Sequence, residues 1–296
     1  MAFRNVSAWA AAPDAGQHHV TTFRKAVASA ATVANDFIDY TYFAGNPPAN
    51  FYASSPSVAA TVETRMGINI PARDQFIKSI TVMSAASSAT GTTNQNQRLC
   101  LADYLLYYPF IDTDAIGEEQ VMDNTVTLPR YVGDRVQMMA VGQSASSAVG
   151  TFTVNYTNQD GTAGRTSQTT YTKVISGGGT LVSSSNNAVT GSHPFIGLQA
   201  GDSGVRSVES VTFSAAGGGL MAIVLVKPLF DFYSTQECRR TTTGNLESYG
   251  AASQFESITQ VPTREVKLGA VLGIIGLGNA GSLASSVLVG TLETVW

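Results

Sequence analysis

The sequence predicts a mainly β protein, built as an antiparallel β-sandwich or jelly roll with an extension at each end. Two observations support this class. Short segments that alternate apolar and polar residues recur along the chain, and clusters of turn-forming residues separate them. Strand-like and helix-like segments do not alternate, which disfavours a doubly wound α/β fold. The 296 residues suffice for two domains or for one large β domain with extensions.

Strands are expected from about residue 66 onwards. Residues 76–83 alternate and are rich in β-branched side chains, which suits a strand with one buried face. Residues 98–110 are almost continuously apolar and form either a buried strand or a short helix, because periodicity alone does not separate the two. Further strands are expected over residues 136–141, 151–156, 165–171, 195–198, 205–213 and 220–226.

The clearest strand pair is a hairpin, in which residues 151–156 and 165–171 both alternate. Asp160 and Gly161 lie between them, and this dipeptide accepts the positive φ angles of a tight turn. Pro228 lacks a backbone N–H and is expected to stop the pairing of the strand that precedes it.

The ends of the chain differ from its middle, so three regions are expected. Residues 1–65 form an N-terminal arm with a short helix over residues 23–38, where apolar side chains recur at a loosely helical spacing. Residues 66–233 form the β body. Residues 234–296 form a C-terminal extension, in which the apolar residues 261–277 suggest one further strand.

The composition favours a protein that contacts other subunits over one that binds nucleic acid or spans a membrane. Charged residues make up only 13% of the chain, about half the usual share, and such surfaces suit permanent contact with neighbouring subunits. The net charge is −4 and no Lys/Arg run exists, which disfavours binding to nucleic acid. The longest apolar run near the C-terminus, residues 268–277, is too short to cross a membrane, and the N-terminus lacks the features of a signal peptide.

One tetrapeptide bears on catalysis. Gly-Asp-Ser-Gly at residues 201–204 resembles the nucleophile segment of chymotrypsin-like proteases, in which the serine attacks with the help of a histidine base. The chain has three histidines: His18 and His19 lie in the expected N-terminal arm, and His193, ten residues before Ser203, is outside the usual chain order. A turn that opens the next strand is the favoured interpretation, and a serine hydrolase using Ser203 is the remote alternative.

An acidic loop bears on metal binding. Counted from Asp112, residues 112–123 carry carboxylates at positions 1, 3 and 12 and glycine at position 6, as a calcium loop would. Ile116 stands at position 5 and Asp rather than Glu at position 12, so an acidic surface loop is favoured and no metal is expected. The weak metal candidates are Asp112, Asp114, Glu118 and Asp123.

No cofactor is expected. Residues 276–281 match the dinucleotide fingerprint GxGxxG, but only 15 residues follow, too few to complete a βαβ unit. Cys100 and Cys238 are expected to be free thiols in apolar surroundings, although a disulfide between them stays open. Clustered aromatic residues are expected in the core and at a subunit interface, and the interface candidates are Phe23, Phe37, Tyr42, Phe43 and Trp296.

Three sets of segments together resemble virion structural proteins of tailed bacteriophages, of the capsid-associated cement or decoration kind. They are residues 100–110 with 122–131, 151–161 with 163–167, and 199–213 with 223–228. The resemblance implies a β-sandwich or jelly-roll body, many copies per virion and assembly in the cytoplasm of a bacterial host. It implies no active-site residues, and the expected partners are further copies of this chain, the major capsid protein or other virion proteins. A major capsid subunit and a portal, collar or tail protein remain alternatives.

Overall fold

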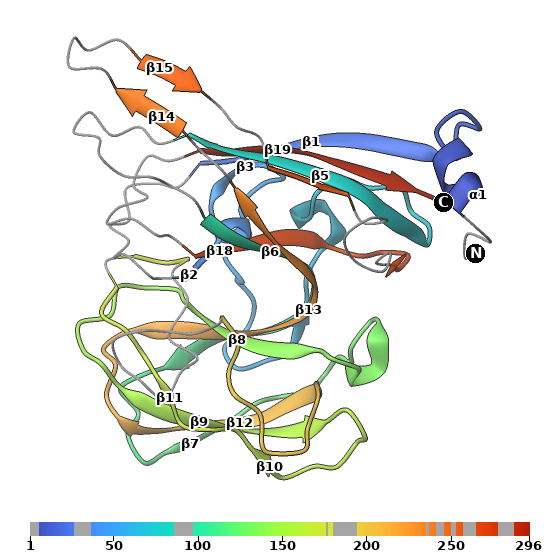
Figure 1. Ribbon diagram of the computed structural model, residues 1–296. Coiled ribbons are helices and arrows are strands. Elements are labelled where there is room, and N and C mark those ends of the chain that lie inside the picture. Colours follow the sequence, from blue (N-terminus) through green and yellow to red (C-terminus); the bar gives the residue numbers. More distant parts are fainter. Residues whose placement is uncertain are drawn as a thin grey trace.

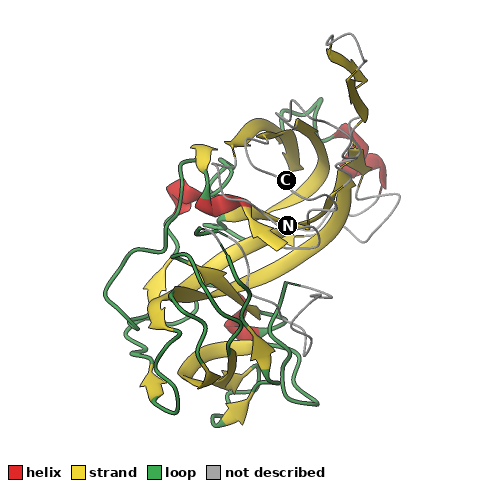
Figure 2. Ribbon diagram, turned by 90° about the vertical axis from the view of Figure 1, so that its left-hand side faces the viewer, coloured by secondary structure: helices red, strands yellow, loops and turns green. Residues whose placement is uncertain are grey.

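The computed structural model shows antiparallel β-sheets and one short α-helix, α1 (Val6–Ala11) (Figure 1). The structure describes residues 6–26, 37–85, 97–175, 177–179, 194–234, 237–240, 246–249, 253–256, 265–277 and 287–296. The mainly β prediction is confirmed, and the sheets include two curled half-barrels, whose curvature is visible in Figure 2. No jelly roll is identified among the described strands, and no described helix is long and apolar enough to cross a membrane.

Two long strands form the centre of the molecule. β6 (Gln97–Asp112) has 16 residues and β13 (Leu220–Ser234) has 15, and the two pair along their whole length. Register shifts on either side of Lys227 bend this ribbon near its middle. The sheet around it, sheet B, has the order β2 (Phe37–Asp39), β18 (Leu272–Leu277), β6, β13 and β8 (Gln137–Gly142), with β4 (Ala60–Thr61) also on β6.

Sheet A lies over one half of this ribbon, at the top of Figure 1. Its order is β16 (Ser253–Glu256), β5 (Gln75–Ala85), β19 (Val287–Val295), β1 (His18–Ala26) and β3 (Ala44–Asn46), with β17 (Glu265–Val266) also on β5. β1 and β19 pair along their full length, from His18 opposite Val295 to Ala26 opposite Val287. The first and last described strands therefore support each other inside one sheet.

Sheet D lies over the other half of the ribbon. Its order is β10 (Arg165–Thr166), β9 (Thr151–Asn158), β12 (Val205–Ala215) and β7 (Glu119–Val121), with β11 (Thr170–Tyr171) also on β9. The predicted hairpin is confirmed, because β10 and β11 both pair with β9 and Gly161 in the turn has a φ of 83°. A separate pair is formed by β14 (Glu237–Arg240) and β15 (Leu246–Tyr249).

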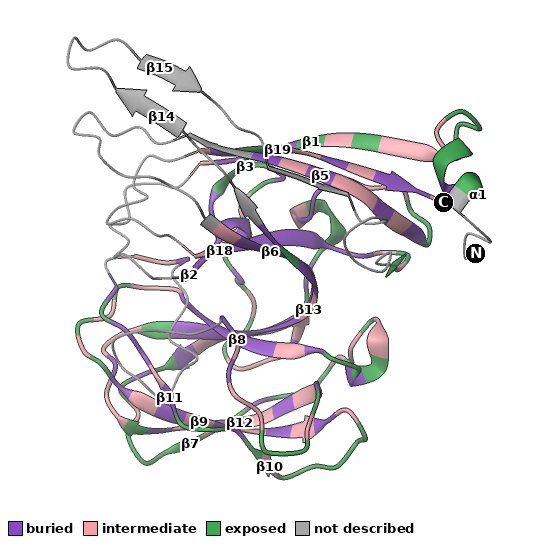
Figure 3. Cartoon of the chain, in the orientation of Figure 1, coloured by how far each residue is buried: buried purple, intermediate pink, exposed green. Residues whose placement is uncertain are grey.

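Three apolar cores lie against the central ribbon, much of which is buried (Figure 3). One core packs between sheet A and the half of the ribbon that contains Leu99. A second packs between sheet D and the half that contains Tyr108. A third surrounds Tyr104, on the opposite face from Leu99, and side chains from residues 52–66 cover it.

The helix expected over residues 23–38 is wrong where the structure describes it. Residues 23–26 belong to β1, and residues 37 and 38 belong to β2. Phe23 and Lys25 alternate inward in β1, which is the period of a strand. Residues 27–36 lie outside the described part of the chain.

Other strand predictions are confirmed with two corrections. Residues 98–110 belong to a strand, β6, and not to a helix. Residues 195–198 form no strand, although the Ile196 N–H donates a hydrogen bond to the Met138 carbonyl at 2.8 Å. Pro228 does not stop β13, because pairing with β6 continues to the end of the strand. β13 loses only its other neighbour, β8, at this point, so Pro228 lies where one edge is unpaired.

A substitution at Gly290 tests the close packing inside sheet A. A Cβ atom on Gly290 would lie 2.2 Å from Phe23 Cζ and 2.6 Å from the Thr81 carbonyl oxygen. We expect Gly290→Ala to lower the free energy of unfolding by about 1–3 kcal/mol in urea denaturation. Val289→Ala, at the exposed neighbouring position, is the control and should change it by roughly 0.5 kcal/mol or less. Equal effects of the two substitutions would contradict this packing.

Candidate functional site

The candidate site is a depression of about 480 Å³ beside the bend of β13. Residues from three parts of the chain line it: β13 itself, the start of β8 with the loop before it, and the segment that leads into β12. The side chains that define its character are Arg135, Gln137, Phe195, Ser203, Leu229 and Phe230. The depression therefore combines an apolar base with a small number of polar groups, as ligand sites do.

A strained loop forms one side of the depression. Tyr131, Val132 and Arg135 have φ angles of 65°, 48° and 52°, a region that side chains other than glycine rarely adopt. Strain of this kind persists only where the surroundings enforce it, and it clusters at functional sites.

The buried carboxylate of Asp103 holds this loop. It accepts hydrogen bonds from Arg130 Nε at 2.8 Å, from Arg130 Nη2 at 2.7 Å and from the Tyr131 hydroxyl at 3.0 Å. The Val271 N–H donates a further bond at 2.8 Å. Lys227 also bonds to Asp134 at 2.9 Å. The loop is thus fixed at both ends of its strained stretch, and the position of Arg135 is fixed with it.

Arg135 is an exposed cation with no hydrogen bond or ion pair to any described residue. The other charged groups of the depression are engaged: Lys227 with Asp134, and Asp231 with Arg98 at 2.5 Å. The carboxylate of Asp134 also interacts with the charge of Arg135, so among the described residues the guanidinium has a neighbouring charge but no hydrogen bond.

Ser203, from the Gly-Asp-Ser-Gly segment, lies in the depression but lacks a base among the described residues. His18 and His19 are on β1 in sheet A, and His193 lies outside the described part. Neighbouring Asp202 is a structural group: it accepts hydrogen bonds from the Tyr156 hydroxyl at 2.6 Å, from an amide at 2.8 Å and from a guanidinium at 2.9 Å.

The hydrogen bonds change the ionisation of Asp202. Burial alone would raise the pKa of Asp202, but bonds from Arg165, Tyr156 and Asn158 outweigh it and lower the pKa to about 2. Asp202 therefore fastens the turn before β12 to the β9 hairpin.

The four acidic candidates do not converge. Asp112 accepts a bond from the Asp114 N–H at 2.8 Å, and Asp114 accepts one from the Gly218 N–H at 2.9 Å. Glu118 is exposed, and Asp123 pairs through its backbone with residues 57–59. The described residues contain no group of three His, Cys, Asp or Glu side chains that could hold a metal ion.

Three of the interface candidates are core residues of this chain. Phe23, Phe37 and Phe43 are 2%, 5% and 5% exposed, so their side chains are not available to a neighbouring subunit. Tyr42 is half-buried and donates a hydrogen bond to the Gln143 carbonyl at 3.2 Å. The guanidinium of Arg73 lies 4.4 Å from the ring centroid of Trp296, which is also half-buried.

The remaining motif residues have structural positions. Cys100 is a buried free thiol whose pKa is raised by burial, and the Cys238 side chain lies outside the described part. Gly276 lies in β18, between β6 and β2 in an antiparallel sheet, and residues 278–281 of the GxGxxG match are not described.

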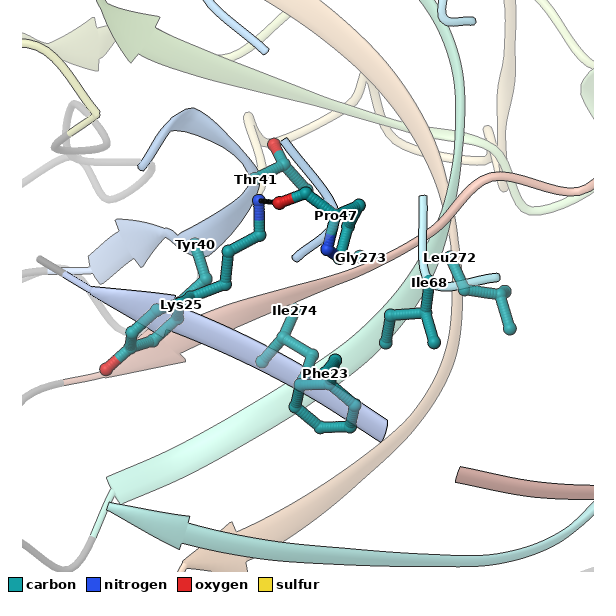
Figure 4. A pocket seen from close by; sticks show the side chains of 9 residues that line it. All are labelled: Phe23, Lys25, Tyr40, Thr41, Pro47, Ile68, Leu272, Gly273 and Ile274. Atoms are coloured by element: carbon teal, nitrogen blue, oxygen red, sulfur yellow. Dashed lines mark hydrogen bonds between the residues drawn. The ribbon is translucent and has the colours of Figure 1, made fainter. Parts of the chain in front are cut away.

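A buried polar cluster links sheets A and B. Lys25 Nζ donates hydrogen bonds to the carbonyls of Phe43, Pro47 and Pro48 at 3.1, 2.7 and 3.0 Å, and Figure 4 shows the bond to Pro47. Beside it is a void of about 10 Å³, room for a single water molecule at most. Burial lowers the pKa of Lys25 to about 8, against the opposing charge of Asp39.

Asp39 is the second centre of the cluster and is fully buried. It accepts hydrogen bonds from the Tyr104 hydroxyl at 2.8 Å, from the Thr41 hydroxyl at 2.7 Å and from the Tyr52 hydroxyl. Burial raises the pKa of Asp39, and these hydrogen bonds oppose that rise. The cluster anchors the segment that covers the third core.

Sequence reasoning did not single out Arg135, Phe195, Lys25 or Asp39. An isolated residue offers no spacing to interpret, so the depression had no signal in the sequence. For Lys25 a signal existed, because it stands two residues after Phe23 and shares its face of a strand.

No family model, curated protein or solved structure matches this chain. The geometry therefore carries the assessment of the site.

The buried lysine gives a pH-dependent prediction. The pKa of Lys25 in the folded chain is below the ordinary lysine value of 10.5, so the unfolded chain binds more protons between about pH 8 and 10.5, and this contribution to stability rises with pH. Lys25→Met should be less stable than the wild type near pH 7, because three carbonyls lose their donor. The deficit should widen by about 2–3 kcal/mol by pH 10.5 in urea denaturation. The control is Lys267→Met, at a half-exposed lysine, whose difference in stability from the wild type should not change with pH. A deficit of Lys25→Met that is equally constant between pH 7 and 10.5 would contradict the prediction.

Asp202 gives a pH dependence of the same sign in the acid range. Its lowered pKa contributes stability above about pH 4, which is lost as the pH falls towards 2. Asp202→Asn should lower the free energy of unfolding by about 1–2 kcal/mol at pH 7 and should flatten the acid limb of its pH profile. The control is Asp160→Asn, at an exposed residue in the turn after β9, which should leave the acid limb of the profile unchanged. An unchanged acid limb in Asp202→Asn would refute the role of Asp202.

Proposed function

We propose that this chain is a structural component of a phage virion, a capsid-associated cement or decoration protein that acts through subunit contacts and performs no reaction. The resemblance of the three sets of segments and the low charge content support this proposal. Under this proposal, the two half-barrels that pack on the ribbon of β6 and β13 take the place of the sandwich-like body expected from the sequence.

The outer face of sheet A is the observation that carries the proposal. Thr22, Thr291 and Thr81 lie in register across three neighbouring strands and form an uncharged row. Val20 and Val289 lie on either side of this row and are 51% and 42% exposed. A sheet face of this composition can pack against a second sheet without stripping water from many charges.

The charges beside the row are arranged to suit a second copy. Arg24 lies on the side of Val289, and Glu293 lies on the side of Val20. A two-fold axis along the threonine row would place the Arg24 side of one copy over the Glu293 side of the other. The same axis would bring Val20 of one copy near Val289 of the other, so the face is complementary to itself.

Sheet D is less suited to this contact, because its outer side chains already bond to one another. Thr166 donates to Asn155 at 3.0 Å, Asn155 to Ser210 at 3.2 Å, and Ser210 to Glu119 at 2.6 Å. These hydrogen bonds link all four strands, so the polar side chains on this face already have partners without a second subunit. The proposal accordingly places self-association on sheet A, and not on free arms, since β1 and β19 pair within the chain.

Two alternatives follow from the sequence. A major capsid subunit or a portal, collar or tail protein shares the structural role and differs in its place and copy number in the virion. A serine hydrolase would use Ser203, for which the described residues supply no base. Labelling by a fluorophosphonate probe that disappears in Ser203→Ala would favour the hydrolase.

Charge placed on the sheet A face tests the proposal. We expect the full chain to associate with rising concentration in analytical ultracentrifugation, and Val289→Glu to remain monomeric, because the two-fold axis places position 289 over Glu293 of the other copy, where like charges would meet. Val121→Glu, at a valine on β7 of sheet D that is 68% exposed against 42% for Val289, should associate as the wild type does. A wild type that is monomeric at every concentration, together with its absence from purified virions in quantitative gels, would refute the proposal.

A further inference from the structure

We infer that the depression beside the bend of β13 binds a carboxylate carried on an apolar or aromatic body. This inference is independent of the proposed structural role and of the sheet A contact. It rests on three features of the depression: a free guanidinium, an apolar base, and a rim that is held in a strained conformation.

The guanidinium of Arg135 selects the anion. A guanidinium presents a planar fork of donors that matches the two oxygens of a carboxylate, and Arg135 has no hydrogen bond to a described residue. The neighbouring carboxylate of Asp134 interacts with the charge of Arg135 but is hydrogen-bonded to Lys227, so among the described residues the donors of Arg135 are open to a ligand. The carboxylate of Asp231 also lines the depression, so a ligand with one negative charge fits better than a doubly charged phosphate.

The base of the depression selects the rest of the ligand. The exposed apolar surface comes from half-buried Phe195 and Pro228, and Leu229 and Phe230 lie beneath it as core residues that are 6% and 7% exposed. The base lies where β13 has lost β8 as a neighbour, so no described strand of sheet B covers it from that side. An aromatic or branched aliphatic group can therefore lie on this base while its carboxylate meets Arg135.

The strained loop gives the arrangement its rigidity. Three left-handed residues within residues 131–135 cost free energy, and the bonds from Arg130 and Tyr131 to Asp103 keep them in place. The backbone of Arg135 is held in this way, so the rim loses little freedom when a small ligand binds, which raises affinity. Ser203 and Gln137, at the rim, supply further polar groups.

Two pairs of probes test the inference by ligand-observed saturation-transfer NMR on the full chain. Phenylacetate with phenylacetamide tests a small free acid, and N-acetyl-Gly-Phe with its C-terminal amide tests a peptide end. At least one acid should bind saturably, roughly five- to tenfold more tightly than its amide. Binding of one acid alone identifies the source of the carboxylate.

Variants assign the effect to Arg135. Arg135→Gln should bind the acid no better than the amide, and Arg135→Lys, which keeps the charge but loses the fork, should fall between. Arg65→Gln, at an exposed arginine that pairs with Glu63 and does not line the depression, should bind as the wild type does. Unchanged thermal unfolding of the Arg135 variants shows that they fold. Equal binding of acid and amide, full binding by Arg135→Gln, or no saturation up to about 20 mM would each overturn the inference.

Discussion

The pairing of β6 with β13 is the constraint on which the rest of the structure depends. This ribbon passes through both half-barrels, and each of the three cores has one wall on it. One half of the ribbon packs against sheet A and the other against sheet D, and the register shifts beside Lys227 mark the change between them. Because the same ribbon contributes to the cores of both half-barrels, the stability of one half-barrel depends on that of the other. Unfolding of either core would disturb the ribbon.

Two buried carboxylates stabilise opposite sides of this central sheet. Asp103, on β6, holds the loop that carries Arg135, and Asp39, on β2, holds the segment that covers the third core. Each accepts several hydrogen bonds, which is the condition for placing a carboxylate in an apolar interior. Lys25 does the same for the carbonyls between residues 43 and 48. These groups position irregular segments that have no sheet of their own to join.

The surface shows how a chain with few charges satisfies its exposed sheets. On sheet D, hydroxyl and amide side chains bond to one another across the strands. On sheet A, Lys78 and Ser79 donate to Glu293 across two strands, while the threonine row and the exposed valines beside it have no side-chain bond to one another among those described. This row makes sheet A the proposed contact. The depression beside β13 differs from both faces, because it is concave and holds a guanidinium without a described hydrogen bond.

The sequence by itself determined the class of the fold and most strands of its middle. Residues 76–83, 151–156 and 205–213 were predictable because alternation in a half-buried strand is a local property. A strand that is buried on both faces has no such alternation. Residues 98–110 could therefore be predicted only as a strand or a helix, and the structure shows that cores cover both faces of β6.

Only the tertiary structure decided which segments meet. β1 pairs with β19 from the far end of the chain, and the expected helix at Phe23 gave way to a strand because that pairing and the core beneath it outweigh weak local propensity. The same holds for the candidate site: Arg135, Phe195 and Leu229 come together through the bend of β13, and no local spacing records such a contact. Alternation in a half-buried strand is set by neighbours along the chain, whereas sheet order, concave sites and strands such as β1 are set by contacts between residues distant in sequence.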